Sequence, residues 1–267
     1  MTTGVIDMNE EKLIVAIHQP NFFPWLGYFS KIVRADRFVF LDNVQIPRTG
    51  AGSWVNRVRL WIGGAAKWFT MPIDKSSEGL RSIAETRIAA NDYVRRKMVA
   101  TLQHSYGKAP FFDDVFPLIA SLVNNPEANL AEYNMHAILK LSTVLGLDAD
   151  KFMRASRLAN DGEVSTDRLI RLTREVGGTV YLYGAVAAQA YQENEKFQRG
   201  NLALLAQSFV HPIYPQFNTS GFVPGLSIID ALMNVVVGGV RDLLCASRDK
   251  GLTEKAQKIC NEELQGS

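Results

Sequence analysis

An apolar run ends abruptly within the segment Ile14-Val-Ala-Ile-His-Gln-Pro-Asn-Phe-Phe-Pro-Trp-Leu-Gly-Tyr28. β-Branched residues fill the run, and a histidine, a glutamine and two prolines then stop it before a helical pattern begins. In α/β proteins, ligands bind where a strand ends at such a polar, proline-stiffened loop. The segment therefore predicts a buried strand with a site at its carboxyl end.

A second apolar run, Phe38–Leu41, ends in the same way at Asp42. The order of a strand, a short helix over Gly27–Val33 and a second strand predicts two parallel strands joined by a right-handed crossover. The carboxyl ends of parallel strands lie at one edge of a sheet. We therefore expect His18 and Asp42 to reach the same edge.

The pattern of the whole chain predicts an α/β fold: a Rossmann-like parallel sheet core, a small antiparallel extension and a helical insertion, together forming one compact domain. The expected parts are a polar N-terminal extension over 1–12, a first α/β part over 13–92, a helical layer or insertion over 93–150, a returning α/β part over 151–247, and a C-terminal helix or tail over 248–267.

Individual helices and strands are predicted from the spacing of hydrophobic residues and from glycines that end helices. A hairpin is expected around Gly63-Gly64. Helices are expected over Tyr93–Tyr106, Pro110–Val123 and Leu130–Leu145, after Thr166 as a cap, and after Ser227. Further strands are expected within Arg81–Ala89, over Thr179–Tyr183 and around Ser208–Val210.

Composition narrows the class of protein. The chain has 267 residues, 47% of them hydrophobic and 21% charged, which is ordinary for a globular protein and excludes a disordered one. A net charge of +2 is too small to indicate nucleic acid as a partner. The start of the chain is polar and acidic, and Ile228–Val240 is too short and too polar to span a bilayer. We expect a cytoplasmic protein.

Two residues are the candidates for catalysis. His18 suits a general base, because the imidazole pKa lies near neutrality, and the prolines around it would hold it in place. Asp42 suits the task of orienting an amine or a hydroxyl. The alternatives are a histidine that holds the loop through backbone hydrogen bonds and an aspartate that caps a turn. No second carboxylate lies close to Asp42 in sequence, so we expect no metal site, and the sequence names no cofactor.

A larger set is expected to bind substrate, because amides, guanidiniums and aromatic rings gather around the two strand ends and the returning α/β part. Arginine suits phosphate or carboxylate, since its planar fork donates two hydrogen bonds at once. A serine at a helix start either binds an anion with the helix N–H groups or simply caps the helix. The set is Gln19, Asn21, Trp25, Gly27, Gln45, Arg48, Asn56, Arg57, Tyr183, Ser227 and Asp230.

The chain resembles the WbqC-like family, whose genes occur among those for bacterial surface polysaccharides such as O-antigen. The resemblance covers nearly the whole chain, in the family's order. It is carried by His18–Phe29, Ala35–Gln45, Asn56-Arg57, Trp68–Pro72, Tyr181–Gly184 and Gly221–Asp230. One departure is Pro47–Gly52, where the family often has an aromatic residue and a lysine before the Asn-Arg pair. The resemblance implies a role in the synthesis of surface polysaccharides but no particular reaction.

At the level of fold, the first strand, its loop, Pro24-Trp-Leu-Gly27 and the short helix are similar to the nucleotidylyltransferase and class I synthetase superfamily. There a His-x-Gly-His element occupies this turn. Trp25 and Tyr28 stand at the places of its histidines, so the imidazolium donors to phosphate are missing.

Three functional hypotheses result. The first is a transferase of surface-glycan biosynthesis that moves an acyl or aminoacyl group from an activated donor onto a nucleotide-activated amino sugar. The second is a nucleotidylyl- or adenylate-forming enzyme on the same scaffold. The third is a module without catalysis that binds a glycan precursor or a carrier protein. The sequence favours an enzyme but names neither donor nor acceptor.

Overall fold

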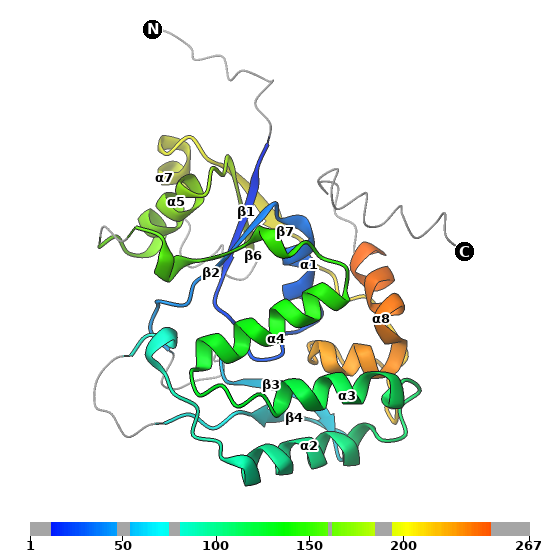
Figure 1. The fold of residues 1–267 in the computed structure, drawn as a ribbon. Coiled ribbons are helices and arrows are strands. Elements are labelled where there is room, and N and C mark those ends of the chain that lie inside the picture. The colour runs from blue at the N-terminus through cyan, green and yellow to red at the C-terminus, as the bar shows by residue number, and fades with distance from the viewer. Residues whose placement is uncertain (1–11, 47–53, 75–80, 160–161, 185–193, 247–267) are drawn as a thin grey trace, which may run out of the picture.

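The computed structural model describes residues 12–46, 54–74, 81–159, 162–184 and 194–246. Within them, five parallel strands form one sheet in the order β5-β2-β1-β6-β7 (Figure 1). The strands are β1 (Ile14–His18), β2 (Arg37–Phe40), β5 (Phe152–Arg154), β6 (Val180–Gly184) and β7 (Ala203–Gln207). The predicted α/β class with a parallel core is confirmed.

The chain builds this sheet outward from β1 in two directions. It first crosses over to β2 and then to β5, and it later returns to the opposite side of β1 to add β6 and β7. Val15 and His18 lie opposite Arg37 and Phe40 in the register of β1 with β2. The direction of building therefore reverses between β1 and β6, which makes this gap the topological switch point of the sheet.

Helices cover both faces of the sheet, as expected for parallel strands that are apolar on both sides. Helices α5 (Ser165–Glu175) and α7 (Asn194–Arg199) pack on the face that carries Val15 and Ile17. Helix α1 (Leu26–Arg34) packs on the other face, and every one of its residues is buried.

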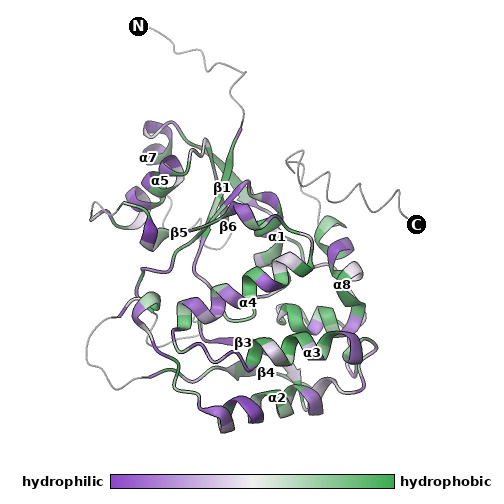
Figure 2. Ribbon diagram, in the orientation of Figure 1, coloured by the Kyte–Doolittle hydropathy of each residue, from purple (hydrophilic) through white to green (hydrophobic). Residues whose placement is uncertain are grey.

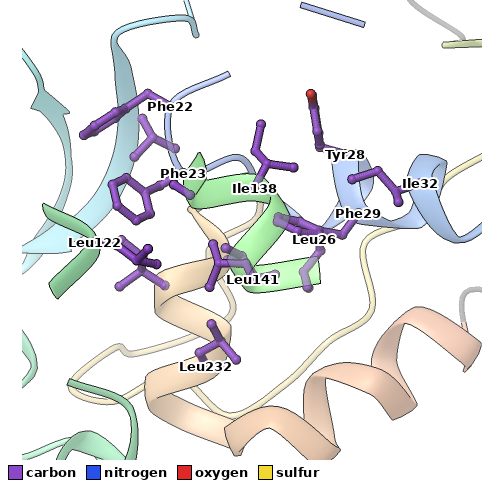
Figure 3. Packing of buried hydrophobic residues seen from close by; sticks show 14 of the residues in the cluster. Phe22, Phe23, Leu26, Tyr28, Phe29, Ile32, Leu122, Ile138, Leu141 and Leu232 are labelled. Carbon is purple, nitrogen blue, oxygen red and sulfur yellow. The ribbon is translucent and has the colours of Figure 1, made fainter. Parts of the chain in front are cut away.

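The larger core lies on the α1 side of the sheet. The Phe22-Phe23 loop packs against Ile138 and Leu141 of α4 (Leu130–Val144) and Leu232 of α8 (Ile228–Ala246), as Figure 3 shows. Hydrophobic residues dominate β1 and α8, whereas α5 carries many hydrophilic ones (Figure 2). The Phe22-Phe23 part of the loop after β1 is therefore held in place by packing against two later helices.

A second, two-stranded sheet forms the predicted antiparallel extension. Strands β3 (Arg57–Ile62) and β4 (Ala65–Thr70) pair around Gly63 and Gly64, whose positive φ angles of 58° and 76° fit the tight turn that twisted hairpins prefer. Helices α2 (Asp92–Tyr106) and α3 (Phe112–Val123) follow, as the sequence predicted, and they pack against each other.

Some predicted elements differ from the structure. No strand lies within Arg81–Ala89, where a 3₁₀ turn, η1 (Ile83–Glu85), is flanked by isolated backbone bridges. The predicted strand around Ser208–Val210 was wrong, because the strand is β7, a few residues earlier, and Val210 is 78% exposed. Thr166 does not cap its helix but lies buried inside α5, which begins after Val164.

Two 3₁₀ turns, η2 (Ala149–Lys151) and η3 (Ala155–Arg157), flank β5. Within the described residues, no helix combines the length and the apolar character that a bilayer crossing needs.

Candidate functional site

The carboxyl ends of the parallel strands meet at one edge of the sheet, and His18 ends β1 there. The backbone N–H of Leu41 donates to His18 O over 2.8 Å, so the end of β2 lies directly beside it. On the other side, β6 ends at Gly184. His18 and Gly184 thus border the switch point, where open α/β sheets bind ligands.

The imidazole of His18 is held in one orientation. Its Nδ1 lies 3.1 Å from Gln19 O, and the ring packs edge-on against Tyr28 at 4.8 Å. A carbonyl oxygen only accepts, so this contact assigns the proton of the neutral ring to Nδ1 and leaves Nε2 as an acceptor. Burial, and then the nearby Lys31 ammonium, lower the pKa of His18 to about 3. At neutral pH the ring is therefore uncharged.

Lys31, which sequence reasoning missed, projects from α1 into the same region. The residue is buried, and its Nζ donates to Ile17 O over 3.2 Å. Adjacent carbonyls of a strand point in opposite directions, and His18 O faces β2, so Ile17 O faces the β6 side. The ammonium therefore lies at the switch point itself.

The charge of Lys31 is poorly compensated. No carboxylate of the described residues pairs with it, and burial lowers its pKa to about 8. A buried, unpaired ammonium is costly, because its charge has lost water and gained only one carbonyl. One sequence signal marks the residue: a lysine directly before the apolar pair Ile32-Val33 in the nine-residue helix Leu26–Arg34.

The loop after His18 adds further polar groups. The Tyr28 hydroxyl donates to Gln19 O over 3.0 Å, and burial raises the pKa of Tyr28 well above its usual range. The side chain of Asn21 is buried and makes no hydrogen bond with any described residue. We call His18, Gln19, Asn21, Tyr28 and Lys31 the β1 cluster.

Asp42 lies on the neighbouring strand end in a different environment. Its Oδ1 accepts from Ser156 N at 2.9 Å, and its Oδ2 accepts from Ser156 Oγ at 2.6 Å and from two guanidinium nitrogens of Arg154 at 3.3 Å. Arg154 also donates to Glu132 Oε1 over 2.6 Å. The fully buried carboxylate is thus surrounded by donors, which tie η3 and β5 to β2. We call Asp42, Glu132, Arg154 and Ser156 the β2 cluster.

The candidate residues of the hairpin and of the segment before it have contacts of their own. Asn56 Nδ2 donates to Met71 O over 3.0 Å, and the Arg57 guanidinium lies 4.3 Å from the centre of the Trp68 ring. Gln45 is exposed and forms a backbone bridge with Ser82. Arg48 lies outside the described residues.

Trp25 and Gly27 depend on each other. A Cβ added to Gly27 would lie 2.4 Å from the Trp25 indole, so the indole fills the space above the glycine backbone. The indole also packs on His211, with ring centres 4.9 Å apart. Tyr183, by strand alternation, faces the α5 side of the sheet. These residues shape the surroundings of the switch point rather than present polar groups to it.

Ser227 and Asp230 have structural partners. The Ser227 hydroxyl donates to Phe23 O over 2.6 Å and accepts from Ile229 N at 3.2 Å, which is an ordinary helix cap. Asp230 is buried and accepts from the Tyr214 and Tyr106 hydroxyls at 2.8 and 3.0 Å. Burial raises the pKa of Asp230. This network fastens α8 to α2.

Comparison with known proteins identifies a family and a relative to which the chain is similar. The model of the WbqC-like protein family matches residues 19–241. The chain is 29% identical over 229 residues to a Mycobacterium tuberculosis (strain ATCC 25618 / H37Rv) protein that bears the name Uncharacterized protein Rv1507c, and the match covers 83% of this chain and 93% of that protein. No solved structure matches. The family match extends over most of the chain and includes both clusters apart from His18, which directly precedes it, and the chain belongs to the WbqC-like protein family.

Proposed function

We propose that this chain is a cytoplasmic transferase of surface-glycan biosynthesis, which moves an acyl or aminoacyl group onto the amine of a nucleotide-activated sugar. The setting rests on the family. The single observation that carries the chemistry is the neutral His18 at the switch point, whose Nε2 is an acceptor without a partner among the described residues.

In the proposed reaction, the sugar amine attacks the carbonyl carbon of the donor. A carbon–nitrogen bond forms, and the bond from the carbonyl carbon to its leaving group breaks. His18 Nε2 takes the proton that the amine loses and returns it to the leaving group. Proton transfer of this kind typically contributes about 10²- to 10⁴-fold to the rate.

Lys31 takes the phosphate-binding role in this proposal. Its ammonium lies at the β6 side of β1, and a nucleotide diphosphate would supply the negative charge that Lys31 lacks. Pairing with phosphate would also cancel the repulsion that contributes to the low pKa of His18. Substrate binding would thereby turn a weak base into a stronger one.

Asp42 enters the proposal as a positioning residue. Its oxygens already accept from Arg154 and Ser156, so it holds the end of β2 beside His18 and does not touch the amine. The nucleotidylyl-transfer alternative is weakened, because the space above Gly27 that would receive a nucleotide is filled by Trp25.

A thermal-shift panel tests the proposal first, with nucleotide sugars, ATP with Mg²⁺, acyl-CoA species and free amino acids. Ligand at about 100 times its dissociation constant stabilises the folded state by about 2.7 kcal/mol, so a nucleotide amino sugar should raise the melting midpoint. The wild-type chain and His18→Gln are then assayed for acyl transfer to the binding sugar. Binding kept with turnover lost supports the transferase. Binding in both proteins without turnover in either, across the donor panel, contradicts it and supports a binding module.

A further inference from the structure

A cavity of about 550 Å³ opens beside the β2 cluster, between the ends of β2 and β5 and helix α4. Its size falls within the range of about 300–1,000 Å³ that is usual for sites of small molecules. The rings of Phe40 and Phe152 stack in its wall with their centres 5.4 Å apart and their planes within 9°. Met135 and Leu139 of α4 add to this apolar part.

The polar part of the cavity is lined by Glu132, His136, Arg154 and Arg157. Asp42 and Glu132 hold the Arg154 guanidinium through Nε and Nη2, which leaves Nη1 without a hydrogen bond to any described residue. Both Asp42 oxygens are used, and one Glu132 oxygen remains as an acceptor. Two carboxylates therefore fix the orientation of an arginine whose remaining donors need an acceptor from elsewhere.

Arg157 adds a second set of donors. It ends the turn η3, lines the cavity, and makes no hydrogen bond or ion pair with the part of the chain that the structure describes. An apolar wall faced by two arginines suits a ligand with an apolar body and one anionic head.

The cavity lies one strand away from His18. Phe40, which lines it, is the register partner of His18, and neighbouring strands are about 4.8 Å apart. Paired residues of neighbouring strands point to the same face of a sheet, so His18 and the cavity share the α1 side.

We propose that this cavity binds the acyl donor, with the acyl body against the half-buried Phe152 and Leu139 and an anionic carboxylate or phosphate group on Arg154 and Arg157. The assignment to the donor rests on the proposed transferase function. The binding of an apolar anion does not, and it is tested separately.

The test uses octanoate, octan-1-ol and octylammonium, which share one apolar chain and differ in the head group. Binding to the full chain is measured by ligand-detected NMR and isothermal titration calorimetry. We expect octanoate to bind best and Arg157→Gln to weaken it about tenfold. Leu139→Trp, which fills the cavity from a half-buried position, should weaken all binding by a similar factor. The matched control is Arg96→Gln, an exposed arginine of α2, and it should change nothing.

The outcomes separate the two proposals. Binding of octanoate that responds to Arg157→Gln and Leu139→Trp supports the cavity, even if no acyl transfer is found. Three results overturn the inference: octanoate affinity that neither variant changes, no octanoate binding at all, or tighter binding of octylammonium than of octanoate. His18→Gln removes the proposed base, and its octanoate affinity should equal that of the wild-type chain.

Discussion

The ends of β1 and β2 lie side by side, yet the side chains of His18 and Asp42 at these two ends are used in opposite ways. In the β2 cluster, the buried Asp42 accepts from four donor atoms, and its partners are fixed by it in turn. In the β1 cluster, His18 Nε2, the side chain of Asn21 and most of the Lys31 ammonium have no partner among the described residues. A satisfied buried network stabilises a fold, whereas unsatisfied buried polar groups cost stability and are typical of ligand sites.

Asp42→Ala should have the largest effect on stability. The change removes the fully buried carboxylate that pairs with the partly exposed Arg154, and breaking a buried ion pair costs about 3–5 kcal/mol. Urea unfolding followed by circular dichroism measures the loss. A loss below about 1 kcal/mol would show that the β2 cluster does not hold the strand end.

Gly27→Ala tests the wall beside the β1 cluster. The new methyl group would overlap the Trp25 indole, and overpacking of this kind typically costs about 1–3 kcal/mol. The double variant Gly27→Ala with Trp25→Leu should recover part of that loss relative to Trp25→Leu alone. Equal effects of Gly27→Ala in both backgrounds, measured by thermal unfolding, would refute the contact as the cause.

Lys31→Met should separate stability from binding. Removing a poorly compensated buried charge should leave the free energy of unfolding unchanged within about 1 kcal/mol, or raise it. The affinity for a phosphate-bearing ligand should fall about tenfold or more, since a charge-assisted hydrogen bond contributes about 1.5–3 kcal/mol. Destabilisation by several kcal/mol with unchanged affinity would show that Lys31 stabilises the fold and does not bind the ligand.

The pH dependence of stability gives a graded effect. Unfolded His18 takes a proton below about pH 6.5, whereas the folded residue does so only near its lowered pKa of about 3. Acid therefore favours the unfolded state, and His18 makes stability rise with pH from about 3 to about 6.5, by at most about 1.4 kcal/mol per pH unit. His18→Gln should flatten this part of the curve, and identical slopes for both proteins would contradict the prediction.

The sequence predicted the first half of the sheet well, because its signals are local. β-Branched runs that stop at polar residues predicted β1 and β2, and the pair Gly63-Gly64 predicted the hairpin. Strand β5 escaped notice, since three residues with the sequence Phe-Met-Arg carry no periodicity. Strand β7 was placed too late because its Ala-Leu-Leu-Ala-Gln sequence lacks β-branched residues.

The candidate site was predictable only in part. His18 and Asp42 reach one edge, as the strand ends indicated. The residues that give His18 and Asp42 their different environments could not be predicted from the two strand ends. Arg154 is 112 residues from Asp42, and Lys31 belongs to a helix that was predicted only as the connection between two strands. Hydrogen-bond occupancy depends on tertiary packing, which a single sequence does not display.

The transferase proposal depends on a neutral, Nδ1-protonated His18 whose Nε2 is free to accept a proton. Nitrogen-15 NMR of the histidine ring, assigned with His18→Gln, reads both the tautomer and the pKa during a pH titration. We expect an Nδ1–H ring with a pKa far below 6.5 in the free protein, and a rise of that pKa when a nucleotide amino sugar binds. A pKa at or above 6.5 in the free protein, or a ring protonated at Nε2, would contradict it.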